Sequence, residues 1–130
     1  MNKGDAGMTI QELYAKIGGN YDQAVKIMKM EKLIDKYVRK LPASGAYDTL
    51  MAASETMDPT GLFEGAHALK GVCGNLGLDA LSAVAGEVTE EFRPGAARKL
   101  TDEQVKEKIQ QVSELYQRAI AGIAEYANNA

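Results

Sequence analysis

Residues 58–77, DPTGLFEGAHALKGVCGNLG, predict one amphipathic helix and set the class of the whole fold. Asp58 can cap the first turn, and Pro59 suits the first helical position. Gly77 suits the left-handed position that follows a helix. We therefore expect a helix that opens at Pro59 and ends at about Asn75 or Leu76.

One side of this helix is apolar. At 100° per residue, the apolar positions fall within an arc of roughly 80°. They are Leu62, Ala66, Leu69, Cys73 and Leu76. His67, the only histidine in the chain, points about 140° away from the centre of that arc. We therefore expect the stripe, with Cys73 as a small buried side chain, to face the core and the imidazole to stand in water.

The neighbours of His67 are candidate functional residues. Lys70 follows three residues later and is a neighbour on the helix surface. Gly71 and Gly74 share the side of His67, although a glycine inside a helix costs about 1 kcal/mol relative to alanine. We expect both glycines to give another protein access to the ring, and we rank close helix packing second. Glu64, one turn earlier, could accept a hydrogen bond from Nδ1 and leave Nε2 as the attacking nitrogen.

The chain before this helix is also predicted to be helical. Thr9 and Glu12 match a capping box, and Gly18-Gly19 would end the short helix that it opens. A longer helix is expected from about Tyr21 to Lys40. Its predicted core-facing positions are Ile27, Met30, Ile34, Tyr37 and Leu41. Pro42 and Gly45 interrupt the pattern, and a shorter helix is expected from about Ala46 to Met57.

Two further helices follow residue 77. One is expected from about Leu78 to Phe92, and the second opens at a Thr101/Gln104 capping box and runs to about Tyr126. The apolar face of the last helix comprises Val105, Ile109, Val112, Tyr116, Ile120 and Ile123. The loop between these two helices carries three basic residues whose charges are expected to be solvated at the surface: Arg93, Arg98 and Lys99.

Short loops between long amphipathic helices favour antiparallel neighbours. The predicted fold is therefore all-α: an antiparallel, up-and-down four-helix bundle with a short accessory N-terminal helix. We expect residues 1–8 to be disordered and residues 9–127 to form a single domain. The Asn128-Asn129-Ala130 end favours a free-standing protein.

Composition and charge exclude several classes of partner and site. The chain has 130 residues, a net charge of −3 and one cysteine, Cys73. Nucleic acid is therefore not expected as the main partner, and an internal disulfide or a two-cysteine zinc site is excluded. No stretch has the length and apolarity of a membrane span or a signal peptide. We expect a monomer in the reducing cytoplasm.

The segment from His67 to Gly77, with the helical setting around it, resembles the signature of histidine-containing phosphotransfer (HPt) domains, the carriers of two-component phosphorelays. The resemblance implies that His67 accepts a phosphoryl group from a receiver-domain aspartyl phosphate and passes it to another receiver aspartate. Partners would be response-regulator receivers or a hybrid sensor kinase. The protein would need no cofactor of its own, because the receiver would supply Mg²⁺. Lys70 would steady the phosphoryl group, and Gly71 and Gly74 would leave access.

Other readings of the same residues are weaker. Glu64 and His67 match half of a di-iron site, but the chain has no second histidine to complete it. The glycine run lacks the ending and the preceding strand of a phosphate-binding loop, so an autonomous kinase is not expected. A Ser-His-Asp triad stays open, although no nucleophile elbow is present.

Two alternatives to a phosphotransfer carrier remain, and the role of one neighbour of His67 is open. The chain could be a helical interaction module that docks a receiver or kinase without holding phosphate, or a generic helical domain in which the motif is accidental. Phe63 is either an exposed aromatic side chain in a docking patch beside His67 or a packing residue under the neighbouring helix.

Overall fold

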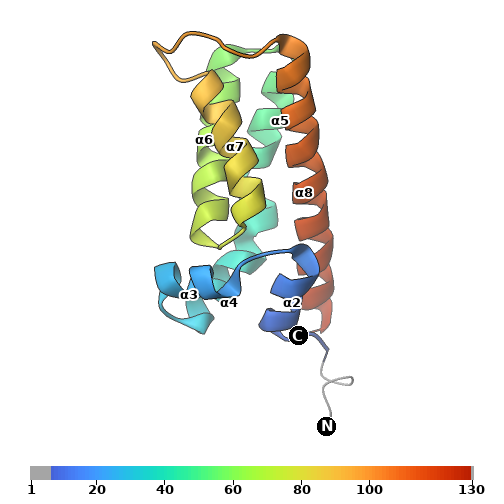
Figure 1. The fold of residues 1–130 in the computed structure, drawn as a ribbon. Helices are drawn as coiled ribbons and strands as arrows, with labels where there is room; N and C mark the ends of the chain where they lie inside the picture. Colours follow the sequence, from blue (N-terminus) through green and yellow to red (C-terminus); the bar gives the residue numbers. More distant parts are fainter. Residues whose placement is uncertain (1–6, 130) are drawn as a thin grey trace.

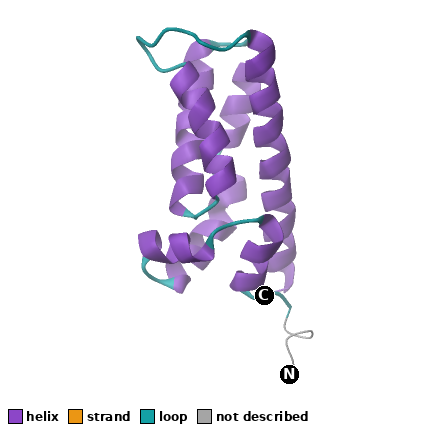
Figure 2. Cartoon of the chain, in the orientation of Figure 1, coloured by secondary structure: helices purple, strands orange, loops and turns teal. Residues whose placement is uncertain are grey.

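The structure, a computed structural model, describes residues 7–129, and all regular structure in that range is helical (Figures 1 and 2). The predicted all-α class is confirmed. Of the N-terminus predicted to be disordered, residues 1–6 lie outside the described residues. The elements are α2 (Ile10–Ile17), α3 (Tyr21–Met28), α4 (Glu31–Lys40), the 3₁₀ turn η1 (Leu41–Ala43), α5 (Ala46–Thr56), α6 (Pro59–Asn75), α7 (Asp79–Glu91) and α8 (Asp102–Asn129).

Four of these helices form the body of the molecule. α6 packs between α5 and α7, and α8 contacts both α7 and α5. The short helices α2, α3 and α4 lie at one end, with α2 against α8, whereas the α7–α8 loop lies at the other end (Figure 1). Helix α6 is therefore held on two sides by α5 and α7, and it also contacts α3.

The core-facing stripes were predicted well for the later helices. The five stripe residues, four in α6 and its C-cap Leu76, are each at most 1% exposed. In α8, Val105, Ile109, Val112, Tyr116 and Ile123 are buried, and Ile120 is partly buried. Burying one large apolar side chain contributes about 1.5–3 kcal/mol, so these stripes are a substantial part of the packing free energy.

The single helix predicted from Tyr21 to Lys40 is wrong. The chain breaks at Lys29, whose φ of 72° is left-handed, and α4 restarts after Met30. Ten residues of continuous helix would separate Tyr21 from Glu31 by about 15 Å. The break folds them together instead, so that the Tyr21 hydroxyl donates a 2.7 Å hydrogen bond to Glu31.

The break also changes which side chains are buried. Three of the five predicted core positions are largely exposed: Ile27 at 41%, Met30 at 54% and Tyr37 at 43%. Ala24, Ile34 and Val38 face the core. The predicted stripe is therefore wrong at those three positions, because the turn at Lys29 resets the phase of the helix.

The end of α6 is fixed by contacts with the N-terminal part of the chain. The buried Tyr14 hydroxyl donates a 2.6 Å hydrogen bond to the carbonyl oxygen of Leu76. Gly77 has a φ of 69°, and a Cβ at this position would lie 2.2 Å from the carbonyl oxygen of Asn20. Only glycine fits both conditions, so the turn after α6 rests directly on the α2–α3 link.

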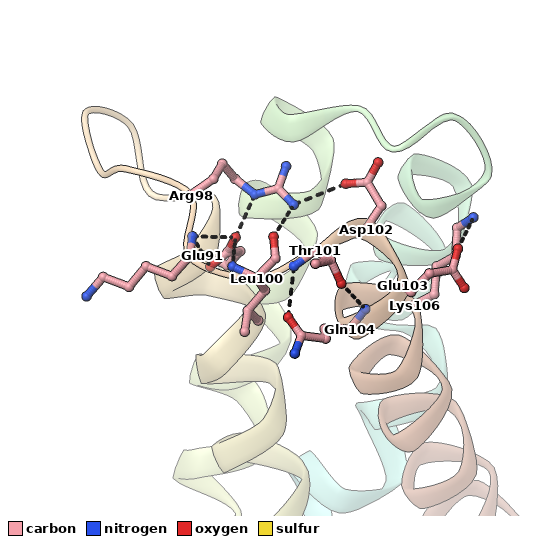
Figure 3. A network of polar contacts seen from close by, with 9 residues as sticks. Glu91, Arg98, Leu100, Thr101, Asp102, Glu103, Gln104 and Lys106 are labelled. Carbon is pink, nitrogen blue, oxygen red and sulfur yellow. Dashed lines mark hydrogen bonds and ion pairs between the residues drawn. The ribbon is translucent and has the colours of Figure 1, made fainter.

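The loop that follows α7 is held by Glu91, which is 7% exposed (Figure 3). Arg98 donates to Glu91 from Nε at 2.6 Å and to Asp102 from Nη2 at 3.1 Å. The backbone N–H groups of Lys99 and Leu100 also donate to the Glu91 carboxylate. The prediction that Arg98 is only solvated charge is therefore wrong, because it fastens the loop to the end of α7.

Candidate functional site

His67 lies in the middle of α6 and is exposed, as the helical wheel predicted. Two glycines bring α6 close to its neighbours. A Cβ on Gly65 would lie 2.6 Å from the backbone nitrogen of Leu50 in α5, and one on Gly74 would lie 3.2 Å from Ser82 Oγ in α7. These approaches leave the imidazole on a firmly held helix.

The register of the α6–α7 hairpin determines which side chains meet His67. Three pairs lie in contact or within reach across the hairpin: Gly74 with Ser82, Lys70 with Gly86, and Phe63 with Arg93. The two members of each pair are equally distant in sequence from Leu78. The last turn of α7 and the residues just after it therefore lie beside the turn of α6 that holds His67.

The Phe63 ring borders both the imidazole and a cation. The Phe63 and His67 ring centroids are 5.3 Å apart with an interplanar angle of 38°. The guanidinium carbon of Arg93 lies 5.5 Å from the Phe63 ring centroid. Phe63 is partly buried and packs against the core. The position of Phe63 therefore fits both roles considered for it, because the side chain packs against the core and its ring also borders His67.

Lys70 is exposed and its aliphatic stem lies across α7. A Cβ on Gly86 would lie 3.4 Å from Lys70 Cδ and 3.5 Å from Lys70 Cε. Glycine at position 86 therefore leaves room for the lysine stem. The hydrogen bond from Arg93 and the charge of Lys70 lower the pKa of the Glu90 carboxyl, one turn beyond Gly86 along α7.

The two candidate access glycines differ. Gly71 is exposed, and a Cβ there would meet nothing within 4 Å. Gly74 instead faces Ser82, whose hydroxyl donates a 3.0 Å hydrogen bond to the Lys70 carbonyl oxygen. Open space thus surrounds Gly71, whereas at Gly74 the geometry favours the close-packing explanation.

Glu64 and Cys73 complete the set considered from sequence. Glu64 is exposed, and among residues 7–129 no hydrogen bond joins it to His67. Cys73 is buried, and burial raises the pKa of its thiol to about 12. Within the same range no group of three or more His, Cys, Asp or Glu side chains is arranged to hold a metal ion.

The family model of the Hpt domain matches residues 27–122. This is most of the chain, and it contains all of α4, α5, α6 and α7. The chain belongs to the Hpt domain family. No curated protein and no solved structure matches it.

Membership defines the general activity. Hpt domains act in phosphotransfer within two-component signalling, as phosphocarriers and in general not as kinases, and they interact with the receiver and kinase domains of phosphorelays. In the described part of this Hpt domain, no helix has the length and apolarity needed to cross a membrane.

Two residues close to Phe63 and His67 were not recognised from the sequence as neighbours of the imidazole. Glu90 was not considered, and Arg93 was predicted to be merely solvated. Arg93 in fact donates to both carboxylate oxygens of Glu90, from Nε at 3.0 Å and from Nη2 at 2.6 Å. The turn at Gly77 and Leu78 was a signal that could have found them. Helices in a hairpin pair symmetrically about the turn, so equal numbers of residues before and after Leu78 place both residues near Phe63 and His67.

Proposed function

We propose that this Hpt domain is a histidine phosphotransfer carrier in a two-component phosphorelay. His67 accepts a phosphoryl group from the aspartyl phosphate of one receiver domain and passes it to the aspartate of another. The observation that carries the proposal is the position of the imidazole, exposed on a helix whose opposite side is buried, beside open space at Gly71.

In the transfer step, the Nε2 lone pair forms a bond to phosphorus while the phosphorus–oxygen bond to the aspartyl carboxylate breaks. The carboxylate leaves with the bonding electrons, and the ring proton stays on Nδ1. Glu64 is the candidate acceptor for a hydrogen bond from that proton. The receiver supplies Mg²⁺, and the reverse sequence of bond changes delivers the phosphoryl group to the next aspartate.

Lys70 contributes positive charge beside the ring. A phosphorylated side chain carries close to two negative charges and three acceptor oxygens, so a nearby ammonium group stabilises it. The stem of Lys70 rests on α7 at Gly86, and its flexible end can turn toward the phosphoryl group. Gly71 leaves the approach to the ring open, and Gly74 keeps α6 and α7 close.

The receiver would dock on the face that surrounds His67 and continues toward α3 and α4. A groove of about 780 Å³ opens between the end of α6 and the segment α3, α4 and η1, where Tyr37 is largely exposed. Its lining includes Met28, Tyr37, Leu41, Val72 and Asn75. An apolar groove beside a polar reactive centre suits a transient protein interface. Phe63 would border the same contact.

The architecture that supports this role is the up-and-down four-helix bundle, which we assign to α5, α6, α7 and α8. Residues 9–127 would form one domain, with α2 as the accessory helix. We propose a monomer that acts without a cofactor of its own, and the single cysteine fits a cytoplasmic location. The second candidate function is an interaction module that docks a receiver or kinase without accepting phosphate.

The test is a phosphorylation assay. The protein is incubated with a phosphorylated receiver or a small-molecule phosphodonor, and intact mass is measured at neutral pH. We expect one added phosphoryl group that is lost in acid, as a phosphoramidate is, and no addition to His67→Gln. Helicity of that variant should equal wild type, because the side chain is exposed. Acid-stable label, or label on His67→Gln, would exclude the proposed carrier role.

If the protein binds a receiver but takes up no phosphoryl group, the interaction module is the correct function instead.

A further inference from the structure

Near the imidazole of His67, the guanidinium group of Arg93 is already paired with a carboxylate, that of Glu90. The Arg93 guanidinium donates to both oxygens of Glu90, in the two-pronged arrangement that arginine also uses for phosphate. Both side chains are exposed, at 43% for Arg93 and 60% for Glu90. Neither is therefore locked in place by packing.

The position of this ion pair relative to His67 is defined by Phe63. Arg93 lies over the Phe63 ring at 5.5 Å, and that ring lies 5.3 Å from the imidazole. Lys70 also lies nearby, because its stem rests beside Gly86 and its charge acts on Glu90. The Arg93 hydrogen bond holds the pKa of Glu90 below its ordinary value, and the charges of Arg93, Lys70 and His67 lower it further. Glu90 thus lies in the local field that would act on a phosphoryl group.

We propose that Glu90 is an internal substitute for the phosphoryl group, one that holds Arg93 while His67 is unmodified and releases it to the phosphohistidine. This inference rests on the proposed carrier function. It assigns a positioning role to Glu90, which acts through Arg93 and does not itself contact the reacting atoms.

The exchange is favoured by charge. Ion pairs between exposed side chains contribute little to stability, so the Glu90–Arg93 pair is easily given up. A phosphoryl group carries close to two negative charges and offers three acceptor oxygens to the same guanidinium group. Because Glu90 competes with the phosphoryl group for Arg93, the phosphoryl group on His67 is stabilised less. Glu90 would thereby keep the phosphohistidine ready to donate its phosphoryl group.

The first experiment measures the equilibrium of phosphoryl transfer between a phosphorylated receiver and the Hpt domain. Glu90→Gln frees Arg93 and removes a negative charge, so we expect about a threefold shift toward phosphohistidine. Glu87→Gln is the matched control. It makes the same charge change on the same helix, but the Glu87 carboxylate pairs with Lys108 of α8 at 3.1 Å. The proposal is wrong if the two variants give the same equilibrium.

A double variant separates exchange of Arg93 from a simple charge effect. In an Arg93→Gln background, Glu90→Gln should produce a much smaller shift than it does alone. An undiminished shift would show that Glu90 acts only through its charge, and that result overturns the exchange. A second readout is the Arg93 Nε–H resonance, which should move when wild-type protein is phosphorylated. A resonance that stays in place also overturns the exchange.

The two proposals fail in different ways. If wild-type protein takes no label at His67, the carrier function fails and the role of Glu90 fails with it. If wild type is labelled while Glu90→Gln matches Glu87→Gln, only the role of Glu90 is excluded.

Discussion

Gly65 of α6 lies so close to Leu50 of α5 that a Cβ on the glycine would come within 2.6 Å of the leucine backbone nitrogen. The obstacle is backbone, which cannot rotate aside. Gly71, about 120° away around the same helix, has nothing within 4 Å of that position. The two glycines lie six residues apart, yet one is required by packing and the other faces open space.

Alanine substitution should therefore have opposite effects at these positions. Gly65→Ala must displace α5 and should lower the free energy of unfolding by about 2 kcal/mol, within the range for overpacked sites. Gly71→Ala should raise it by up to about 1 kcal/mol, because alanine is the better helix former. Urea unfolding followed by circular dichroism measures both. Equal effects at the two sites would contradict the packing described for α5 and α6.

Lys29→Gly distinguishes the observed break from a continuous helix. Lysine at a φ of 72° carries a left-handed strain that glycine does not. We expect the variant to gain about 1 kcal/mol in the free energy of unfolding. A continuous helix from Tyr21 to Lys40 would instead lose about 1 kcal/mol on the same substitution. The sign of the change in thermal unfolding decides between the two structures.

Glu91→Gln should weaken the α7–α8 loop in a pH-dependent way. Burial alone would raise the pKa of Glu91, but the hydrogen bonds from Arg98, Leu100 and Lys99 outweigh it and hold that pKa below 4.5. A carboxylate with a lowered pKa stabilises the fold above its ordinary pKa and loses that effect as the pH falls. We expect wild type to exceed the variant by about 2 kcal/mol at neutral pH.

That advantage should fade as the pH drops below about 4.5, the ordinary value for this carboxyl. Chemical unfolding of both proteins across this range measures it. A difference that does not vary with pH would show that the Glu91 charge is not what holds the loop.

Phe63→Ala tests whether the ring serves docking or packing. Phe63 is partly buried and borders His67 and Arg93. We expect receiver binding, measured by titration calorimetry, to weaken about tenfold, as for an aromatic residue at an interface. Thermal stability should fall by far less than for Phe92→Ala, whose ring is 7% exposed. Comparable losses of stability in the two variants would assign Phe63 to the core.

Tyr37→Ser tests the docking groove near α3 and α4. The tyrosine is 43% exposed and lines the groove, so its loss should weaken receiver binding several-fold and leave stability within about 0.5 kcal/mol of wild type. Gln110→Ala, at an exposed position on α8, is the control. Binding that is unchanged in Tyr37→Ser would place the receiver elsewhere on the surface.

Features that depend on neighbours along the chain were predicted correctly. The Thr9 capping box, the Asp58 cap and the left-handed Gly77 all occur as expected. So does the outward direction of His67, because a helix of 3.6 residues per turn places it opposite the apolar stripe whatever lies nearby. Each of these follows from hydrogen bonds and rotations within a few residues.

The amino-acid sequence by itself therefore determined the helical class, most of the helices and the exposed imidazole. Tertiary structure alone decided the break at Lys29, the packing of Gly74 against Ser82 and the pairing of Glu90 with Arg93 beside the Phe63 ring. These features depend on which surfaces of distant segments meet and in what register. Local propensity carries no information about that, because the free energy comes from contacts made only after the helices have assembled.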